Sequence, residues 1–351
     1  MSAIPSRRDV ILVADYHDQN VVIRWFNEAT GEERLLRCHV NPVALHQLVQ
    51  RAVREASDAS GKVVWIMEST TGWARLRKLI GQEVRFLVAN VLQMPQSPKA
   101  YRRKTDKIDT ARILREYLSG TLPLSFQPTE PLRAIRRLVA LRESLVARRT
   151  ALRNWMDRTL AHETWRSRSG LWSAKGMYRL KSLLPMLPDP DRAVFSLKLR
   201  ELEHLAQLLD QVTKELLAIY NTWPAAQRLD EIPGIGPISA VSILARIGPI
   251  QRFRRSEKLI AFAGLAPGVR ESEGSRREGR IGGGGTDKHL RHYLIEATFW
   301  ARRVPRYNPT YQRVLQKRGP KIARIVVARM LLRSIHAMLR GCVRFDRQRV
   351  A

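Results

Sequence analysis

Short apolar runs separated by polar breaks fill the first third of the chain. The runs that predict strands lie at residues 10–16, 20–26, 34–40, 62–68 and 83–89. Helical periodicity appears between and after them, at residues 42–57, 73–80 and 104–114. The resulting order is three strands, a helix, a strand, a helix, a strand and a helix. This order predicts an α/β domain.

From about residue 128 the pattern changes to long helices with apolar residues at alternating spacings of three and four. The first stretch is interrupted at Arg148 and contains Leu138, Leu141, Leu145, Leu152 and Trp155. The second is unbroken and contains Leu202, Leu205, Leu209, Val212, Leu216, Ile219 and Trp223. Such a seam requires a partner helix, which is either the first stretch folded back as a hairpin or a helix of another subunit. Residues 167–192 lie between the stretches and are rich in Gly, Ser and Pro, so we expect an irregular connection there.

A third region begins near Leu229. The sequence Pro-Gly-Ile-Gly-Pro precedes a small-residue helix and resembles a helix-hairpin-helix turn, in which Gly234 and Gly236 let backbone amides approach a DNA phosphate. The alternative is a plain tight turn between packed helices. A segment rich in Gly, Ser and Arg follows and opens into another helix, and a basic helix at 321–341 closes the chain.

These patterns divide the chain into three expected domains. Residues 1–125 form the α/β domain, residues 126–226 a helical coiled-coil region, and residues 227–351 a mainly helical C-terminal domain with the helix-hairpin-helix-like element.

The chain is strongly basic, with 62 Lys and Arg against 32 Asp and Glu and a formal net charge of +30. This excess predicts a polyanionic partner, with nucleic acid ahead of an anionic membrane. No apolar run approaches the roughly 18 residues that span a bilayer, and the N-terminal segment lacks the pattern of a cleavable signal. Cys38 and Cys342 are too few and too far apart for a disulfide framework or a CxxC zinc site. These features predict a cytoplasmic protein.

Four acids stand out in this basic chain. Asp15 ends the first predicted strand and Glu68 ends the fourth, so each is attached to a strongly apolar run. Asp106 and Asp109 are three positions apart on a predicted helix, which puts them on one face. Taken singly, a strand-end acid is a turn or cap residue, and acids in a first helical turn complement the helix dipole.

Taken together, the four acids favour a metal site. Phosphoryl transfer on DNA commonly uses two divalent ions about 4 Å apart. Mg²⁺ prefers oxygen ligands and keeps several waters, so three or four carboxylates from separate elements are sufficient to hold it. Asp15, Glu68, Asp106 and Asp109 meet that requirement, and we expect them to bind Mg²⁺.

This pattern resembles the RNase H-like fold in its RuvC-like form. More narrowly, "VADY", "MESTTGW" and "KTDKIDTARIL" are similar to the D, E, D and D motifs of the DEDD transposases of bacterial insertion sequences, the family of bridge-RNA-guided recombinases. The sequences "IPGIGPISAVSILARIG", "FAGLAPGVRESEGS" and "GRIGGGGTDKHLRHYL" resemble that family's C-terminal transposase domain. The motifs occur in the family's order and span nearly the whole chain.

The resemblance implies a serine nucleophile in the C-terminal domain that attacks DNA and forms a covalent phosphoserine. The matching position is Ser272, and Ser275 is its nearest competitor. No histidine lies within several residues to activate a hydroxyl, so a metal held by the four acids is the expected activator. The arginines that we expect to hold the scissile phosphate are Arg270, Arg276, Arg277 and Arg280.

The resemblance also implies the partners, donor and target DNA and a guide RNA, and it favours active sites shared between subunits. The unbroken seam from Leu202 to Trp223 and the joining of two DNA duplexes favour a homodimer or homotetramer. Two departures from the family's pattern are visible. Residues 68–72 read Glu-Ser-Thr-Thr-Gly, one residue longer than the usual E-x-T-G, and four glycines at 282–285 replace a common Ser-Lys pair.

Several basic stretches provide candidate nucleic-acid contacts. Arg102, Arg103 and Lys104 lie beside Tyr101, and Trp155 lies near other arginine-rich stretches. Aromatic side chains between cations suit stacking on unpaired bases, and guide RNA would bind such a surface. The alternative is a solvated helix face. His289 and His292 have no carboxylate or cysteine nearby in sequence to complete a metal motif, so we interpret them as surface or phosphate contacts.

Two rival functions remain at this point. One is a RuvC-like junction resolvase or nuclease, in which a metal-activated water hydrolyses DNA and Ser272 has no chemical role. The other is a non-enzymatic DNA-binding protein, for which the basic charge and the helix-hairpin-helix element are sufficient.

Overall fold

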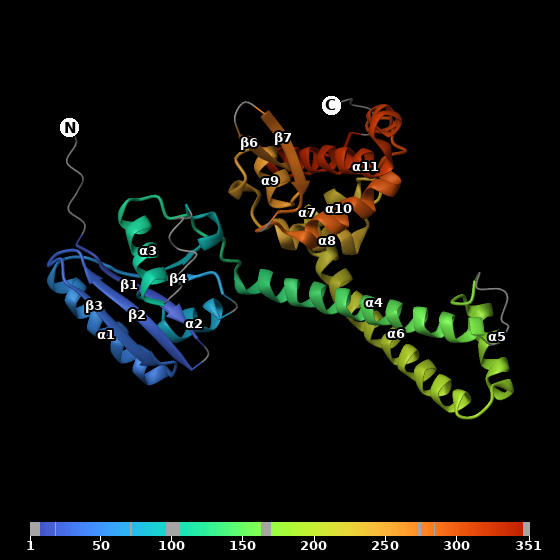
Figure 1. The fold of residues 1–351 in the computed structure, drawn as a ribbon, viewed down its shortest axis with the longest axis horizontal. Helices are drawn as coiled ribbons and strands as arrows, with labels where there is room; N and C mark the ends of the chain where they lie inside the picture. The colour runs from blue at the N-terminus through green and yellow to red at the C-terminus, as the bar shows by residue number, and fades with distance from the viewer. Residues whose placement is uncertain are drawn as a thin grey trace. The chain divides into compact units, whose positions relative to one another are not determined.

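The computed structural model describes residues 8–17, 19–70, 72–95, 106–162, 170–272, 275–283 and 285–346 (Figure 1). Within those ranges, the side chains of residues 106–108, 161, 162, 183 and 267–280 are outside the description. The chain forms two compact units, residues 1–127 and residues 128–351. The three-domain division expected from the sequence stays a prediction.

The N-terminal unit is built on a five-stranded mixed sheet. Its strands are β1 (Val10–Tyr16), β2 (Asn20–Asn27), β3 (Glu33–His39), β4 (Val63–Glu68) and β5 (Arg85–Ala89). Its helices are α1 (Pro42–Asp58), α2 (Trp73–Ile80), α3 (Asp106–Leu118) and the short 3₁₀ helix η1 (Val91–Gln93). The strand order is β3-β2-β1-β4-β5, in which β1, β4 and β5 are parallel and β2 is antiparallel to both neighbours. This mixed sheet confirms the predicted α/β unit and is compatible with an RNase H-like fold.

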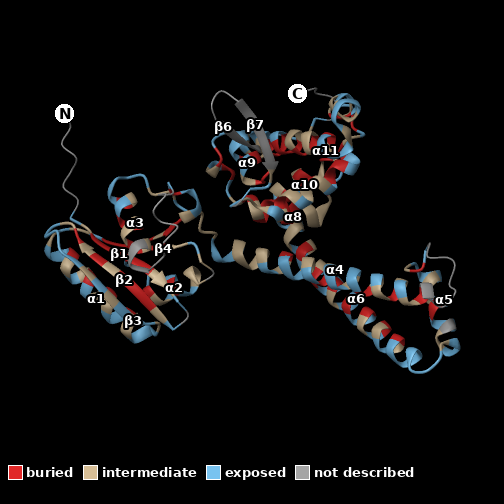
Figure 2. Cartoon of the chain, in the orientation of Figure 1, coloured by how far each residue is buried: buried red, intermediate tan, exposed pale blue. Residues whose placement is uncertain are grey.

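Successive side chains of a strand point to opposite faces of the sheet, and in the central strands both sets are apolar. Helices therefore cover both faces. One face packs Leu12, Trp25 and Trp65 against α1 and α2. The opposite face packs Ile11 and Val13 of β1 against α3. Figure 2 shows the buried central strands between the partly exposed helices. Because β1 and β4 are buried on both faces, their C-terminal ends are held firmly in place.

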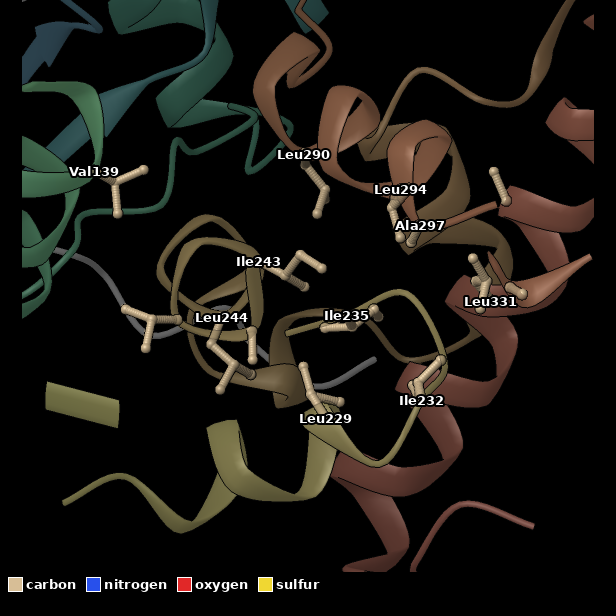
Figure 3. Close-up of a cluster of buried hydrophobic side chains, with 14 of the residues drawn as sticks. Val139, Leu229, Ile232, Ile235, Ile243, Leu244, Leu290, Leu294, Ala297 and Leu331 are labelled. Atoms are coloured by element: carbon tan, nitrogen blue, oxygen red, sulfur yellow. The ribbon is translucent and has the colours of Figure 1, made fainter. Parts of the chain in front are cut away.

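The C-terminal unit is mostly helical. Its helices are α4 (Glu130–His162), α5 (Ala174–Leu183), α6 (Asp191–Asn221), α7 (Pro224–Asp230), α8 (Pro237–Ile247), α9 (Ser256–Phe262), α10 (Lys288–Ala301) and α11 (Asn308–Gly341). Short 3₁₀ helices are η2 (Leu184–Met186) and η3 (Ile250–Arg252), and a hairpin is formed by β6 (Pro267–Ser272) and β7 (Ser275–Ile281). One hydrophobic cluster runs through the unit from α4 to α11. Figure 3 shows its centre, where Val139 of α4, Leu244 of α8 and Leu331 of α11 contribute to one core.

Helix α6 folds back along α4 of the same chain (Figure 1). The first five positions of its predicted seam, from Leu202 to Leu216, are buried in the shared core. Leu141 was expected on the α4 seam but is 47% exposed, and Val139 and Met156 are buried instead. The seam is therefore filled within the chain, so it does not by itself require a second subunit.

The segment expected to be an irregular connection is partly helical, which corrects that prediction. Helix α5 begins after Ser173, whose hydroxyl accepts a hydrogen bond of 3.1 Å from the amide of Gly176. A side-chain cap of this kind starts a helix even in a stretch rich in glycine and serine. The prediction was made from composition alone and did not take this capping residue into account.

The last helix, α11, is kinked at Gly319, where φ is 77° and ψ is 174°. Pro320 follows, and a proline cannot continue the hydrogen bonding of the preceding turn. The predicted basic helix at 321–341 is the part of α11 after this kink. No helix within the described part of the chain is long and apolar enough to cross a membrane.

Candidate active site

The ends of β1 and β4 bring the first two predicted acids to one edge of the sheet. The two strands are parallel neighbours, and Ala14 pairs with Met67 at the last paired position. The next residues along the two strands are Asp15 and Glu68. Both are partly exposed, and the side chain of Asp15 is 21% accessible. Adjacent parallel strands thus place these two acids side by side in the backbone.

The same two acids share one face of the sheet. Strand side chains alternate between faces, so Asp15 follows Ile11 and Val13, and Glu68 follows Val64 and Ile66. All four of these apolar residues belong to the core beneath α3. Both carboxylates therefore lie on the α3 side of the sheet, at its carboxyl edge.

Helix α3 adds the other two acids in its first turn. Asp106 is its first residue and Asp109 its fourth. Asp109 is partly buried and precedes Ile113 by one turn, and Ile113 packs on the sheet. The side chain of Asp106 lies outside the described residues. Asp109 and Ile113 thus share the side of α3 that packs toward the sheet. The gathering of Asp106 and Asp109 with the two strand-end acids stays a prediction.

Two contacts that the sequence did not predict surround these acids. Arg24 of β2 is opposite Val13 in the sheet, and its Nε donates to Thr110 Oγ1 over 3.2 Å. Arg24 also pairs with Glu33, and burial lowers the pKa of its guanidinium. Thr110 is next to Asp109 and only 1% exposed, so this bond fixes the first turn of α3 on the sheet. The sequence feature that could have indicated this contact is Arg24 itself, a single arginine inside an otherwise apolar strand.

The second unpredicted contact is made by His17. Its Nε2 lies 3.7 Å from Oδ2 of Asp15, and its side chain is 57% exposed. An imidazole at this distance from a carboxylate can attract it when protonated. The residue follows β1 directly, so its position at the acidic edge was readable from the strand end.

The turn after Glu68 explains the extended motif. The amide of Thr70 donates to the carbonyl oxygen of Glu68 over 2.8 Å. Gly72 is the N-cap of α2, and a Cβ atom there would lie 2.1 Å from the ring of Tyr16. The longer turn therefore still brings a glycine against Tyr16, the neighbour of Asp15. Glycine is required because no side chain fits between the turn and that ring.

The acids suit a divalent cation by their chemistry, since carboxylate oxygens are the preferred ligands of Mg²⁺. Their placement on one face and one edge also fits. Within the described side chains, however, no three His, Cys, Asp or Glu residues come close enough to form a metal-binding group. Asp15, Glu68 and Asp109 share a location without forming a complete set of ligands, and Asp106 is outside that comparison.

The predicted serine lies in a hairpin that sequence reasoning did not find. Ser272 is the last residue of β6, and its Cα partner across the hairpin is Ser275. Arg270 is paired with Arg277, and Arg276 with Glu271. Arg280 is also in β7; the side chains of all these residues are outside the described part. The two candidate serines therefore occupy directly opposed backbone positions beside the turn.

The base of this hairpin is better defined. Gly264 precedes it and Gly282 follows it, with φ of 67° and 84°. The Nη1 of Arg291 in α10 donates to the carbonyl oxygen of Gly264 over 3.4 Å. Added Cβ atoms at Gly264 and Gly282 would lie 2.7 and 2.2 Å from the same Nη1. One of the four unexpected glycines therefore provides space for Arg291.

The two glycines of the predicted helix-hairpin-helix turn differ. Gly234 has a φ of 95°, and a Cβ there would lie 2.4 Å from the carbonyl oxygen of Ala297 in α10. Gly236 is the N-cap of α8, and no atom lies within 4 Å of its Cβ position. Packing against α10 is a sufficient reason for Gly234. The phosphate contact stays a prediction for both, with open space only at Gly236.

His289 does have a carboxylate partner in space, which corrects the earlier interpretation. Its Nδ1 lies 2.7 Å from Oε2 of Glu143 in α4. Tyr293 lies one turn later, and burial, the largest cause, raises its pKa to about 12. The pairing links α10 to α4, elements far apart in sequence, which is why local spacing could not reveal it.

The structure describes only one of the residues that we expected to contact unpaired bases or their phosphates. Arg102, Arg103, Lys104 and Tyr101 lie outside the described residues. Trp155 packs on the hydrophobic core of the C-terminal unit, with its ring centroid 6.2 Å from that of Phe195. Trp155 is therefore a packing residue in this chain, and the expectation that it stacks on bases is wrong.

Two family models match separate parts of the chain. A family model described as "Transposase", of the DEDD type, matches residues 14–163, and one described as "Transposase IS116/IS110/IS902 family" matches residues 226–316. The first match contains the four acids and the second contains Ser272 and its hairpin.

Similar proteins carry related names. The "Putative transposase y4pF/y4sB" of Sinorhizobium fredii is 28% identical over 83% of this chain and 76% of its own length. The "Probable family 20 transposase" of Pseudomonas aeruginosa is 28% identical over 86% of this chain and 91% of its own. The "Transposase for insertion sequence element IS1111A" of Coxiella burnetii is 29% identical over 62% of this chain and 61% of its own length. Together with the two family matches, these similarities show that the chain belongs to the DEDD transposase family of insertion sequences.

Proposed function

We propose that this protein is a transposase that cuts DNA and rejoins it through a covalent serine-DNA linkage. The observation that carries the proposal is the placement of Asp15 and Glu68. They follow the last paired residues of two parallel strands and lie on the sheet face that α3 covers with Asp109. Acids gathered at the carboxyl edge of a buried sheet, in a chain of net charge +30, suit phosphoryl transfer on a polyanion.

Asp15, Glu68, Asp106 and Asp109 would hold Mg²⁺ in this proposal. When bound, the ion supplies positive charge against the phosphate and lowers the pKa of a coordinated hydroxyl or water. The protein's own contribution is position. Strands β1 and β4 are held by the core, and the Arg24–Thr110 hydrogen bond fixes the first turn of α3.

Ser272 is the proposed nucleophile. Its hydroxyl gives its proton to solvent and its Oγ forms a bond to the scissile phosphorus, while one ester P–O bond of the DNA breaks. The departing strand ends in a hydroxyl that takes up a proton. A hydroxyl of the strand to be joined then attacks the phosphoserine, which restores the DNA ester and the serine. The energy of the original ester bond is retained, so rejoining requires no further cofactor.

The arginines of the hairpin would hold the phosphate during these steps. Arg270, Arg276, Arg277 and Arg280 belong to the two strands that end at Ser272 and start at Ser275. Guanidinium groups match two phosphate oxygens at once. The proposal also requires the serine to reach the acids of the N-terminal unit, within one chain or between two chains.

The choice of DNA sequence would come from a guide RNA, with donor and target DNA selected by base pairing. This part rests on the family resemblance, and the excess of Lys and Arg supplies the charge that binding of two nucleic acids requires. Joining two DNA duplexes also favours a dimer or tetramer. Sequencing of nucleic acid that co-purifies with the full chain tests the guide: a discrete RNA species supports it, and random RNA contradicts it.

The serine is tested with end-labelled DNA on a denaturing gel. Wild type should give a protein-DNA adduct that survives denaturation in the presence of Mg²⁺. Ser272→Ala should abolish the adduct, and Ser275→Ala should retain it. The two serines are matched controls because they are paired across the same hairpin. Unchanged DNA cleavage in Ser272→Ala would instead establish hydrolysis by a metal-activated water, as in a junction resolvase.

A further inference from the structure

A basic surface lies on α10 and α11, beside the base of the hairpin that carries Ser272. Lys288, Arg291, His292, Ile295 and Phe299 recur along α10 at spacings of three and four, so they share one helix face. Helix α11 packs beside α10 and contributes a second row. Its 34 residues include eight Lys and Arg and no acid. Between residues 288 and 303 the single acid is Glu296.

A pocket of about 430 Å³ opens between these two helices. Lys288 and Arg291 line it from α10, and Lys321 and Arg324 line it from α11. His292 and three isoleucines complete the lining, and no carboxylate among the described residues contributes to it. Four cations around one cavity, with no carboxylate among its described lining residues, favour a bound anion, and guanidinium and ammonium groups together suit phosphate.

Arg291 is held in place in this pocket. Its Nη1 donates to the Gly264 carbonyl oxygen over 3.4 Å and lies beside Gly282, where a side chain would displace it. A cation that is restricted by a hydrogen bond to the backbone loses less conformational entropy when a phosphate binds. The pocket therefore contains at least one preorganised donor.

Exposed aromatic rings continue this surface along α10. Phe299 is 39% exposed and Trp300 is 61% exposed. The guanidinium carbon of Arg324 lies 4.8 Å from the centroid of the Phe299 ring, and that of Arg303 lies 5.0 Å from the Trp300 ring. Arg324 thus belongs both to the pocket and to the aromatic group. The contact of Arg324 with Phe299 therefore joins the pocket to the exposed rings, since Trp300 is the next residue of α10.

We propose that this α10–α11 surface binds an unpaired strand of DNA, with its phosphates in the pocket and its bases on Phe299 and Trp300. Base faces are accessible to aromatic side chains only when the strand is not stacked in a duplex. A cationic groove bordered by aromatic rings is the usual composition of a site for single strands. The inference requires DNA as the substrate but not the serine, the metal ion or the guide RNA.

Fluorescence anisotropy with the full chain tests the stacking half of the proposal. The probes are a labelled oligothymidylate of about 15 nucleotides, within the range that one such site covers, and a duplex of equal length. The variants Phe299→Ala and Trp300→Ala should each weaken single-strand binding about fivefold or more, since one stacked base contributes about 1–3 kcal/mol. Duplex affinity should stay within about twofold of wild type. Tyr178→Ala removes a 79% exposed aromatic ring from α5 and should change neither affinity.

The charge half is tested by salt dependence. Lys321→Gln and Arg324→Gln should each reduce the slope of log affinity against log salt by about 0.7 for the oligothymidylate, the value for one phosphate contact on a single strand. Lys214→Gln also removes an exposed cation, one that pairs with Asp210 on α6, and should leave the slope unchanged. Equal slopes in all three variants would overturn the pocket as a phosphate site.

Photocrosslinking locates the strand without relying on variants. An oligothymidylate containing 5-iodouracil should crosslink to the peptide that carries Phe299 and Trp300. Crosslinks confined to other peptides, or equal losses of duplex and single-strand binding in Phe299→Ala and Trp300→Ala, would overturn the proposal. The two alanine variants should also be compared for binding of an oligouridylate RNA. If they weaken binding of this RNA more than binding of the DNA strand, the surface belongs to RNA and the assignment to DNA is overturned.

Discussion

The two units place their proposed catalytic residues on different kinds of secondary structure. In the N-terminal unit, Asp15 and Glu68 follow strands that are buried between helices on both faces. In the C-terminal unit, Ser272 ends a strand whose described pairing is with β7 alone. A two-stranded ribbon has little stability of its own in water. The sheet fixes its acids through packing, whereas the hairpin depends on contacts at its base.

Those contacts at the base are specific. Arg329 Nε donates to the Leu265 carbonyl oxygen over 2.7 Å, and the Asp287 amide donates to that of Phe262 over 2.8 Å. Together with Arg291 at Gly264, they hold both ends of the hairpin to α9, α10 and α11. In the proposed mechanism the two units therefore have different roles: the sheet would keep the metal ligands in a fixed place, and the hairpin would carry the nucleophile.

The hydrophobic cores of the two units also differ, because one is divided and the other is continuous. The sheet divides the N-terminal core into two clusters, one under α1 and α2 and one under α3. The C-terminal core is one cluster from α4 to α11. A disturbance in the C-terminal unit should therefore spread through all its helices, whereas the acidic edge should be insulated from it.

The largest expected effect is on the acids. Asp15→Asn and Glu68→Gln should each reduce DNA cleavage by about a thousandfold or more, because loss of a ligand removes several kcal/mol of transition-state stabilisation. Both side chains are partly exposed and the substitutions conserve shape, so thermal unfolding should change little. Cleavage is measured with labelled DNA and Mg²⁺. Glu83→Gln, at an exposed acid of the same unit, should retain full activity, and wild-type cleavage in both site variants would remove the acids from the mechanism.

The next effect concerns the continuous C-terminal core. Leu216→Ala should lower the free energy of unfolding of this unit by about 2–5 kcal/mol, because Leu216 is fully buried. Hydrogen exchange should accelerate in α8 and α11 as well as in α4 and α6, but not in β1 and β4. Leu197→Ala on the same helix, at a 58% exposed position, should cost less than about 0.5 kcal/mol. Faster exchange confined to α4 and α6 would show that the core is divided.

The two glycines before α8 should respond unequally. Gly234→Ala should destabilise the unit by about 2 kcal/mol or more, since its positive φ and the backbone of Ala297 both exclude a Cβ. Gly236→Ala should cost less than about 1 kcal/mol, because its φ is −86° and the space is open. Chemical denaturation of the pair measures the difference. Equal costs would contradict the close packing of this turn on α10.

The smallest effect tests the base of the hairpin. Gly282→Ala should cost about 1 kcal/mol of stability through its φ of 84° and should displace Arg291, whose flexible end can move. Formation of the serine-DNA adduct should fall a few-fold, because displacement of Arg291 removes its contact with the base of the hairpin that carries Ser272. Gly283→Ala is the matched control, because no atom lies within 4 Å of its Cβ position. Identical adduct yields from the two variants would show that Arg291 does not support the hairpin.

The N-terminal fold was readable from the sequence because burial on both faces leaves a strong pattern. The apolar runs of β1 and β4 end directly at Asp15 and Glu68, so a strand prediction also placed two acids. The face that they share follows from strand alternation. The resemblance to DEDD transposases is confirmed by the family matches.

The C-terminal hairpin was not readable because its strands are rich in Arg, Glu, Ser and Gly and lack apolar alternation. The described backbone pairing of this hairpin leaves no such periodic signal in the sequence. The His289–Glu143 pair and the Arg24–Thr110 bond depend on tertiary contacts between distant segments. Trp155 was misassigned because a tryptophan among arginines on a helix has the same local sequence whether it faces solvent or the core.

The gathering of the acids around a cation is tested most directly by anomalous diffraction from crystals of the full chain grown with Mn²⁺. Mn²⁺ takes the oxygen ligands that Mg²⁺ takes. The account predicts an anomalous peak about 2 Å from carboxylate oxygens of Asp15 and Glu68, with Asp106 or Asp109 completing the site. An occupied Mn²⁺ site elsewhere, with no peak at the ends of β1 and β4, would contradict it.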